Sequence, residues 1–148
     1  NEHGINSRLS EIQSAILNIK LKYLKKDIAI RKRISSFYDV HLHKKELIKP
    51  KVKIHNSHVY HLYVVSYQKR DSLLKFLKKK GIFLSVQYPV PIHKMTAFNK
   101  ALNNYDKKNL NNTEKYSKKI FSLPTYPTLK KADQLKIIKE VNNFVKKN

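Results

Sequence analysis

Apolar side chains recur at intervals of three and four residues in the first part of the chain, the spacing of an amphipathic helix. The first such run starts near Ser7, whose hydroxyl is suited to capping a helix N-terminus. A second run covers about residues 26–43. The pattern allows one continuous helix or two helices with a bend near Leu24.

Two later runs predict further helices. Residues 71–80 carry leucine and phenylalanine on one face and are followed by Gly81, the residue type preferred just after a helix C-terminus. Residues 130–146 carry a similar apolar stripe. Shorter helical segments are expected at 93–102 and at 113–121, with Thr113 as the N-cap of the latter.

Strand signals are fewer. Residues 59–67 are rich in β-branched and aromatic side chains, and residues 82–86 form a second short apolar run. Residues 122–127 should be extended, because proline disfavours helix at the residue before it and the segment holds two prolines. Several helices and few strands indicate an α+β domain with a small sheet packed against helices.

The formal charge of +22 raises the possibility of a basic module that binds nucleic acid. Lysine outnumbers arginine 28 to 4, however, and the lysines are spread through every segment. Nucleic-acid readers rely on arginine for its bidentate fork. We therefore expect no specific nucleic-acid partner, and we keep a basic binding module as an alternative.

Other compositional features narrow the class of protein. An apolar content of 41% and only two glycines are typical of a globular chain. No cysteine is present, and no apolar run approaches the roughly 18 residues of a membrane span. We expect a cytoplasmic protein without membrane association, and the spacing of the histidines and carboxylates predicts no metal site.

Five sequence blocks resemble, in order, the DegT/DnrJ/EryC1/StrS family of sugar aminotransferases that use pyridoxal phosphate. The blocks are Gly4-Ile5-Asn6-Ser7-Arg8 running on to Gln13, His58-Val59-Tyr60-His61-Leu62-Tyr63, Arg70-Asp71 with Gly81-Ile82, Tyr88-Pro89-Val90-Pro91-Ile92-His93, and Thr113-Glu114 with Ser122-Leu123-Pro124 and Tyr126-Pro127. The resemblance extends over essentially all of the 148 residues.

The resemblance implies the small C-terminal domain of a fold-type I aminotransferase that works as a homodimer, with active sites at the subunit interface. Residues 1–45 would then be interdomain and interface helices, and residues 46–148 the small α+β domain. It also implies that Asn6, with Arg8 nearby, binds the phosphate of pyridoxal 5'-phosphate. An amide can donate to a phosphate oxygen, and a following helix N-terminus favours the same anion.

The same resemblance implies that Gln87, Tyr88 and His93 line the pocket for the sugar. Gln87 departs from the family pattern, which usually has histidine at this position. Glutamine can donate and accept hydrogen bonds, but it cannot carry a proton near neutral pH. A role in recognising sugar hydroxyls is therefore favoured over a role in acid–base chemistry.

In the family, the lysine that forms a Schiff base with the cofactor precedes the segment that matches Gly4. None of the 28 lysines here lies in such a context, so we predict no catalytic residue in this chain. We expect the chain to be the C-terminal portion of an enzyme that transfers an amino group, usually from glutamate, to a nucleotide-linked keto-sugar. The product would serve polysaccharide or glycan biosynthesis. A split-gene or catalytically inactive remnant is the other alternative.

Overall fold

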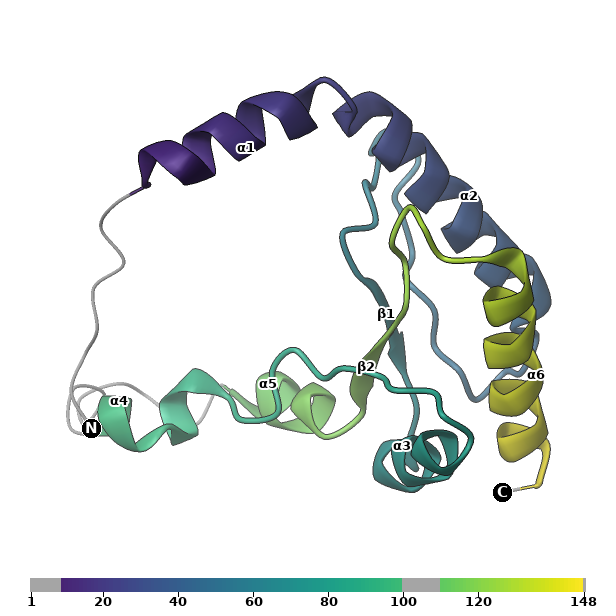
Figure 1. Cartoon of the computed structure of the whole chain (residues 1–148). Helices are drawn as coiled ribbons and strands as arrows, with labels where there is room; N and C mark the ends of the chain where they lie inside the picture. The colour runs from purple at the N-terminus through teal and green to yellow at the C-terminus, as the bar shows by residue number, and fades with distance from the viewer. Residues whose placement is uncertain (1–8, 100–109, 148) are drawn as a thin grey trace.

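The computed structural model describes residues 9–99 and 110–147 and is shown in Figure 1. Its helices and strands confirm the expected α+β class with a small sheet. In chain order they are α1 (Glu11–Leu21), α2 (Leu24–His41), β1 (Tyr63–Ser66), α3 (Arg70–Lys79), the 3₁₀ helix η1 (Ile92–Lys94), α4 (Thr96–Asn99), α5 (Asn111–Ser117), β2 (Ile120–Leu123) and α6 (Lys131–Lys147).

The core lies where α2, α3 and α6 meet the sheet. Helix α6 packs against both α2 and α3, and β1 lies beside β2 (Figure 1). Removal of apolar side chains from water is the main force that holds these elements together. The most deeply buried of them include Tyr38 on α2, Leu42 just after α2, Tyr63, Val65 and Phe121 on the strands, Leu73 and Leu77 on α3, and Val141 on α6.

The two strands are antiparallel, with Tyr63 opposite Leu123 and Ser66 opposite Ile120. A single bridge extends each outer edge of this pair. Ile48 bridges to Ser66 on the β1 side, and Ser85 bridges to Ser122 on the β2 side. Residues from distant parts of the sequence therefore lie side by side across the sheet, and this arrangement positions the candidate site.

The first two helical runs form separate helices with a turn at Lys22 and Tyr23, so the bent alternative is correct. The expectation that the first helix begins near Ser7 is wrong, since Leu9 and Ser10 are not helical. Ser10 is the N-cap and forms a capping box with Gln13: its hydroxyl accepts from the Gln13 amide at 3.2 Å, and Gln13 Oε1 accepts from the Ser10 amide at 3.1 Å. Ser7 itself lies outside the described residues.

The two later helices are confirmed, because α3 and α6 lie within one residue of the predicted bounds. Gly81 has φ +72°, the left-handed conformation that ends many helices and that glycine adopts without steric cost. The turns expected at 93–102 are η1 and α4 as far as Asn99, and residues 100–102 lie outside the described residues.

The expected strand 59–67 is too long. Tyr60 has φ +50°, which is incompatible with an extended strand, and the carbonyls of Tyr60 and His61 accept hydrogen bonds from Arg31 rather than from a neighbouring strand. Only Tyr63–Ser66 forms regular strand.

The expected strand 82–86 reduces to the one bridge at Ser85. The Ser122 amide donates to the Ser85 carbonyl at 2.8 Å. The next amide on that edge of β2 would belong to Pro124, which has no hydrogen to donate, so the ladder stops.

The expected helix 113–121 is also wrong at both ends. Helix α5 begins at Asn111 with Leu110 as N-cap, so Thr113 caps nothing. Residues 120 and 121 belong to β2, because pairing with β1 outweighs the helical pattern there.

Candidate functional site

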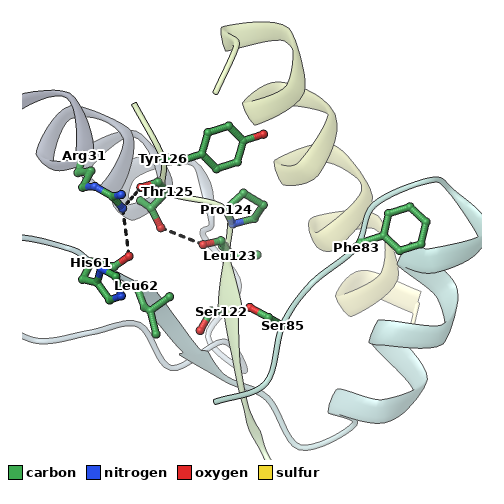
Figure 2. A pocket seen from close by; sticks show the side chains of 10 residues that line it. All are labelled: Arg31, His61, Leu62, Phe83, Ser85, Ser122, Leu123, Pro124, Thr125 and Tyr126. Atoms are coloured by element: carbon green, nitrogen blue, oxygen red, sulfur yellow. Dashed lines mark hydrogen bonds between the residues drawn. The ribbon is translucent and has the colours of Figure 1, made fainter. Parts of the chain in front are cut away.

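A cavity of about 330 Å³ lies beside β2, where the β1 approach, the Ser85 bridge and the segment after β2 converge (Figure 2). Its lining combines polar groups with exposed aromatic rings. The lining residues are Arg31, His61, Leu62, Phe83, Ser85, Ser122, Leu123, Pro124, Thr125 and Tyr126. The site therefore depends on residues up to 95 positions apart in the sequence, counted from Arg31 to Tyr126.

Arg31 fixes one end of this cavity. Its Nη1 donates to the carbonyl oxygens of Thr125 and His61, the latter at 3.1 Å, as the dashed lines in Figure 2 show. A third contact reaches the Tyr60 carbonyl at 3.4 Å. The side chain on α2 thus joins the loop before β1 to the segment after β2 and supplies donors to carbonyls that make no strand ladder.

Gln87 does not line the cavity, but it is hydrogen-bonded to two serines that do. Its Oε1 accepts a hydrogen bond from Ser122 Oγ at 2.9 Å and one from Ser85 Oγ at 3.3 Å. Both serines line the cavity. Because the amide oxygen is occupied by two hydroxyls, the NH₂ group of Gln87 keeps two donors for which no partner is found among the described residues.

Tyr88 and His93 occupy very different environments although only five positions separate them. The Tyr88 side chain is 72% exposed, and it does not line this cavity. His93 on η1 is buried and contacts Glu114 on α5. The structure therefore brings Gln87 to the edge of the cavity and leaves Tyr88 and His93 outside its lining.

Glu114 connects two residues of η1. Its Oε1 lies 3.0 Å from His93 Nε2, and its Oε2 accepts from Lys94 Nζ at 2.7 Å. The hydrogen bond from Lys94, and then that from His93, hold the pKa of the Glu114 carboxyl below its usual value. The carboxylate form is therefore favoured at neutral pH.

A second cavity of about 530 Å³ lies under the junction of α1 and α2. Its lining is largely apolar and includes Leu17, Leu21, Leu24, Ile28, Val59 and Pro127. Helix α1 buries none of its side chains, and Ile12 and Ile19 are exposed despite their apolar character. A helix with an uncovered apolar face is typical of an interaction surface.

Asn6 and Arg8, the residues expected to bind the cofactor phosphate, lie outside the described residues. The groups beside the first cavity are hydroxyls, an amide, the imidazole of His61 and one guanidinium whose Nη1 is taken by three carbonyls. The hydroxyls and the amide suit a ligand that carries hydroxyl groups. The binding of the cofactor phosphate by Asn6 and Arg8 stays a prediction.

Some functional candidates were missed from the sequence. Arg31 and Ser85 had no local signal, since a single arginine on a helix and a serine in an apolar run are common surface residues. Glu114 and Ser122 belong to one of the family blocks, but the sequence does not show that each pairs with the 87–93 segment. A contact between segments 21 or 35 residues apart leaves no periodic pattern to read.

Two further observations concern membrane-spanning helices and metal sites. Within residues 9–99 and 110–147, no helix is both long and apolar enough to cross a membrane. Over the same part of the chain, no group of three or more histidine, aspartate or glutamate side chains is arranged to hold a metal ion.

The chain is similar to several proteins named as transaminases of dTDP-linked aminosugars. The chain is 32% identical over 141 residues to a dTDP-3-amino-3,6-dideoxy-alpha-D-galactopyranose transaminase of Aneurinibacillus thermoaerophilus, a match that covers 95% of the chain and 38% of the relative. It is 37% identical over 149 residues to a dTDP-3-amino-3,4,6-trideoxy-alpha-D-glucose transaminase of Micromonospora megalomicea, covering 96% of the chain and 39% of the relative.

The fold gives the same result. The structure superposes on the crystal structure of DesV from S. venezuelae with a TM-score of 0.85 and 30% identity, over 96% of this chain and 38% of that one. The chain therefore spans less than two-fifths of the length of these relatives. The model of the DegT/DnrJ/EryC1/StrS aminotransferase family matches residues 1–142, and the chain belongs to this family.

Proposed function

We propose that this chain is the C-terminal portion of a cytoplasmic, homodimeric enzyme that uses pyridoxal phosphate to transfer an amino group from glutamate to a nucleotide-linked keto-sugar. The product would serve polysaccharide or glycan biosynthesis. The observation that carries the proposal is the family match over residues 1–142, together with relatives named as transaminases of dTDP-linked aminosugars. The chain would supply recognition of the sugar, and the covalent chemistry would come from a lysine outside it.

The groups beside the first cavity support a role in binding hydroxyls. Ser85 and Ser122 hold the Gln87 amide oxygen, so the Gln87 NH₂ would donate to a sugar oxygen. Gln87 remains uncharged near neutral pH, so its part would be to orient the sugar and not to move a proton. Tyr88, with its exposed ring, would cover one face of the bound sugar.

Asn6 and Arg8 would hold the phosphate of pyridoxal phosphate, which mainly contacts a domain outside this chain. When bound, the cofactor supplies the aldehyde that carries the amino group and the electron sink for its transfer. The residues of this chain would exclude water and fix the position of the sugar carbonyl relative to that group.

The exposed face of α1 supports the assignment of residues 1–45 to an interface. Ile12, Ile16 and Ile19 are each more than half exposed, and the cavity beneath α1 is largely apolar. Such a surface would be covered in the intact dimer by the remainder of the enzyme. Residues 46–148 would form the small domain, and the last part of α2 packs against its core.

The direct test uses the full-length protein with pyridoxal phosphate, ¹⁵N-glutamate and a panel of dTDP- and UDP-linked 3-keto-sugars. Mass spectrometry should detect a ¹⁵N-labelled aminosugar with at least one of them. The 148 residues alone, mixed with pyridoxal phosphate, should give no stable absorbance of protein-bound cofactor. Full-length protein that binds the cofactor and labels no sugar would refute the proposed substrate class.

One variant, measured with both substrates, tests the sugar site. Gln87→Ala should raise KM for the keto-sugar about tenfold, the effect of losing one or two hydrogen bonds. KM for glutamate should not change, because Gln87 would contact only the sugar. Equal effects on both substrates would contradict the assigned role.

A further inference from the structure

The segment 87–93 is held at both ends. Gln87 is bonded to Ser122 on β2, and His93 is bonded to Glu114 on α5. Pro89 and Pro91 between them restrict the backbone torsions of the connecting residues. The position of the segment therefore depends on two side-chain contacts, of which only the first touches the candidate cavity.

The hydrogen bond between His93 and Glu114 has a defined donor and acceptor. An ionised carboxylate can only accept hydrogen bonds, so His93 Nε2 must carry the hydrogen that it donates to Glu114 Oε1 at 3.0 Å. A neutral imidazole protonated at Nε2 keeps its lone pair on Nδ1. Glu114 thereby selects one of the two tautomers of a histidine that is buried.

Lys94 reinforces the same contact from the neighbouring position. Its ammonium group lies 2.7 Å from the other oxygen of Glu114, so the carboxylate bridges two consecutive residues of η1. The chain has 32 lysines and arginines against 10 aspartates and glutamates. The carboxylate placed between His93 and Lys94 holds both side chains against α5.

We infer that Glu114 is a positioning residue for sugar recognition: by bridging His93 and Lys94 it fixes the 87–93 segment on α5 and holds His93 as the Nε2–H tautomer. This inference rests on the proposed function for its catalytic consequence. The tautomer and the fixed segment are properties of the chain itself. Glu114 acts through His93 and Gln87 and contacts no substrate.

The first test reads the tautomer directly and requires no activity. Imidazole ¹⁵N spectra of the 148-residue chain, with His93 assigned from His93→Gln, should show that the neutral ring of His93 carries its hydrogen on Nε2 and not on Nδ1. In Glu114→Ala this preference should be lost, whereas Lys94→Met should retain it because the carboxylate remains. An Nδ1–H tautomer in the wild type, or no change in Glu114→Ala, would overturn the inference.

The second test measures consequences in the full-length holoenzyme. Glu114→Ala should lower kcat/KM for the keto-sugar roughly tenfold or more, as expected when a recognition group is misplaced. The absorbance change on adding glutamate alone should keep its wild-type rate. Glu114→Asp retains the charge on a shorter side chain and should recover part of the loss. Glu46→Ala removes an exposed carboxylate elsewhere and should have no effect.

The two tests separate the possible failures. If the wild-type holoenzyme aminates no sugar, the proposed function fails while the tautomer result still decides the role of Glu114 in the chain. If the enzyme is active and Glu114→Ala leaves sugar kinetics unchanged, the positioning role is refuted and the proposed function stands. Thermal unfolding of each variant shows that any loss occurs in folded protein.

Discussion

At the scale of single residues, the charge on Glu114 controls its two contacts. Its pKa lies below the usual value mainly because of the hydrogen bond from Lys94 and secondarily because of that from His93. A group whose pKa is lower in the folded state contributes stability above its unfolded pKa, and this contribution is lost as the pH falls through the folded pKa. The contacts of η1 with α5 should therefore weaken on acidification.

This leads to a prediction about Lys94. Lys94→Met should raise the pKa of Glu114 more than His93→Gln does, because the lysine is the larger cause of the shift. Side-chain carboxyl ¹³C shifts followed through a pH titration measure both values. A larger rise in His93→Gln would show that the histidine is the main partner.

Gln87 gives a second prediction at the residue scale. Gln87→His places the usual family residue in contact distance of Ser85 and Ser122, and it adds a group that titrates near neutral pH. In the full-length enzyme, kcat/KM for the sugar should then acquire an inflection near pH ~6.5 that the wild type lacks. Rate profiles of the two proteins, with Gln87→Asn as an uncharged control, make the comparison. The same profile in all three would mean that position 87 does not contact the sugar.

At the scale of single elements, Gly81 ends α3 in a conformation that other residues adopt at a cost. A Cβ built at this position meets no atom within 4 Å, so space is not the constraint. Gly81→Ala should nevertheless lower the free energy of unfolding by about 1–2 kcal/mol, from the left-handed backbone alone. Urea denaturation of the chain measures this.

Gly81→Asn is the control for that measurement, because asparagine tolerates the left-handed region better than alanine. It should cost less than Gly81→Ala although its side chain is larger. A greater cost for asparagine would mean that packing and not backbone conformation decides this position.

The capping of α1 and the fate of the predicted strands show what local pattern reveals about an element. Ser10 and Gln13 form a capping box that the sequence contains at the correct spacing, but the interpretation placed the cap at Ser7. Helices α3 and α6 were predicted closely, because each has a continuous apolar stripe. The strands were predicted poorly, because residues distant in sequence decide where a strand ends. Pro124 stops the ladder beside Ser85, and Arg31 binds the carbonyl of His61 before β1.

At the scale of the whole molecule, α1 is the element least supported by the rest of the chain. It is 11 residues long and buries no side chain, whereas helices of this length are marginal in water without packing. Figure 1 shows it extending away from the core formed by α2, α3, α6 and the sheet. Its stability should therefore depend on what covers its apolar face.

We predict that backbone amides of α1 exchange with solvent much faster in the 148-residue chain than in the full-length protein. Amides of α6, which buries five side chains in the core, should exchange slowly in both. Hydrogen exchange followed by mass spectrometry resolves the two helices. Equal protection of α1 in both proteins would contradict the assignment of this helix to an interface.

The sequence by itself determined the family, the α+β class and the helices whose apolar stripes repeat within one element, because these signals are local or lie in short ordered blocks. It also pointed to the 87–93 segment. Only the tertiary structure decided that Gln87 bonds to Ser122, that His93 bonds to Glu114 and that Arg31 joins Tyr60 to Thr125. Each of these contacts joins residues 21 to 94 positions apart, and its formation depends on how the helices and the sheet pack rather than on any neighbour in the chain.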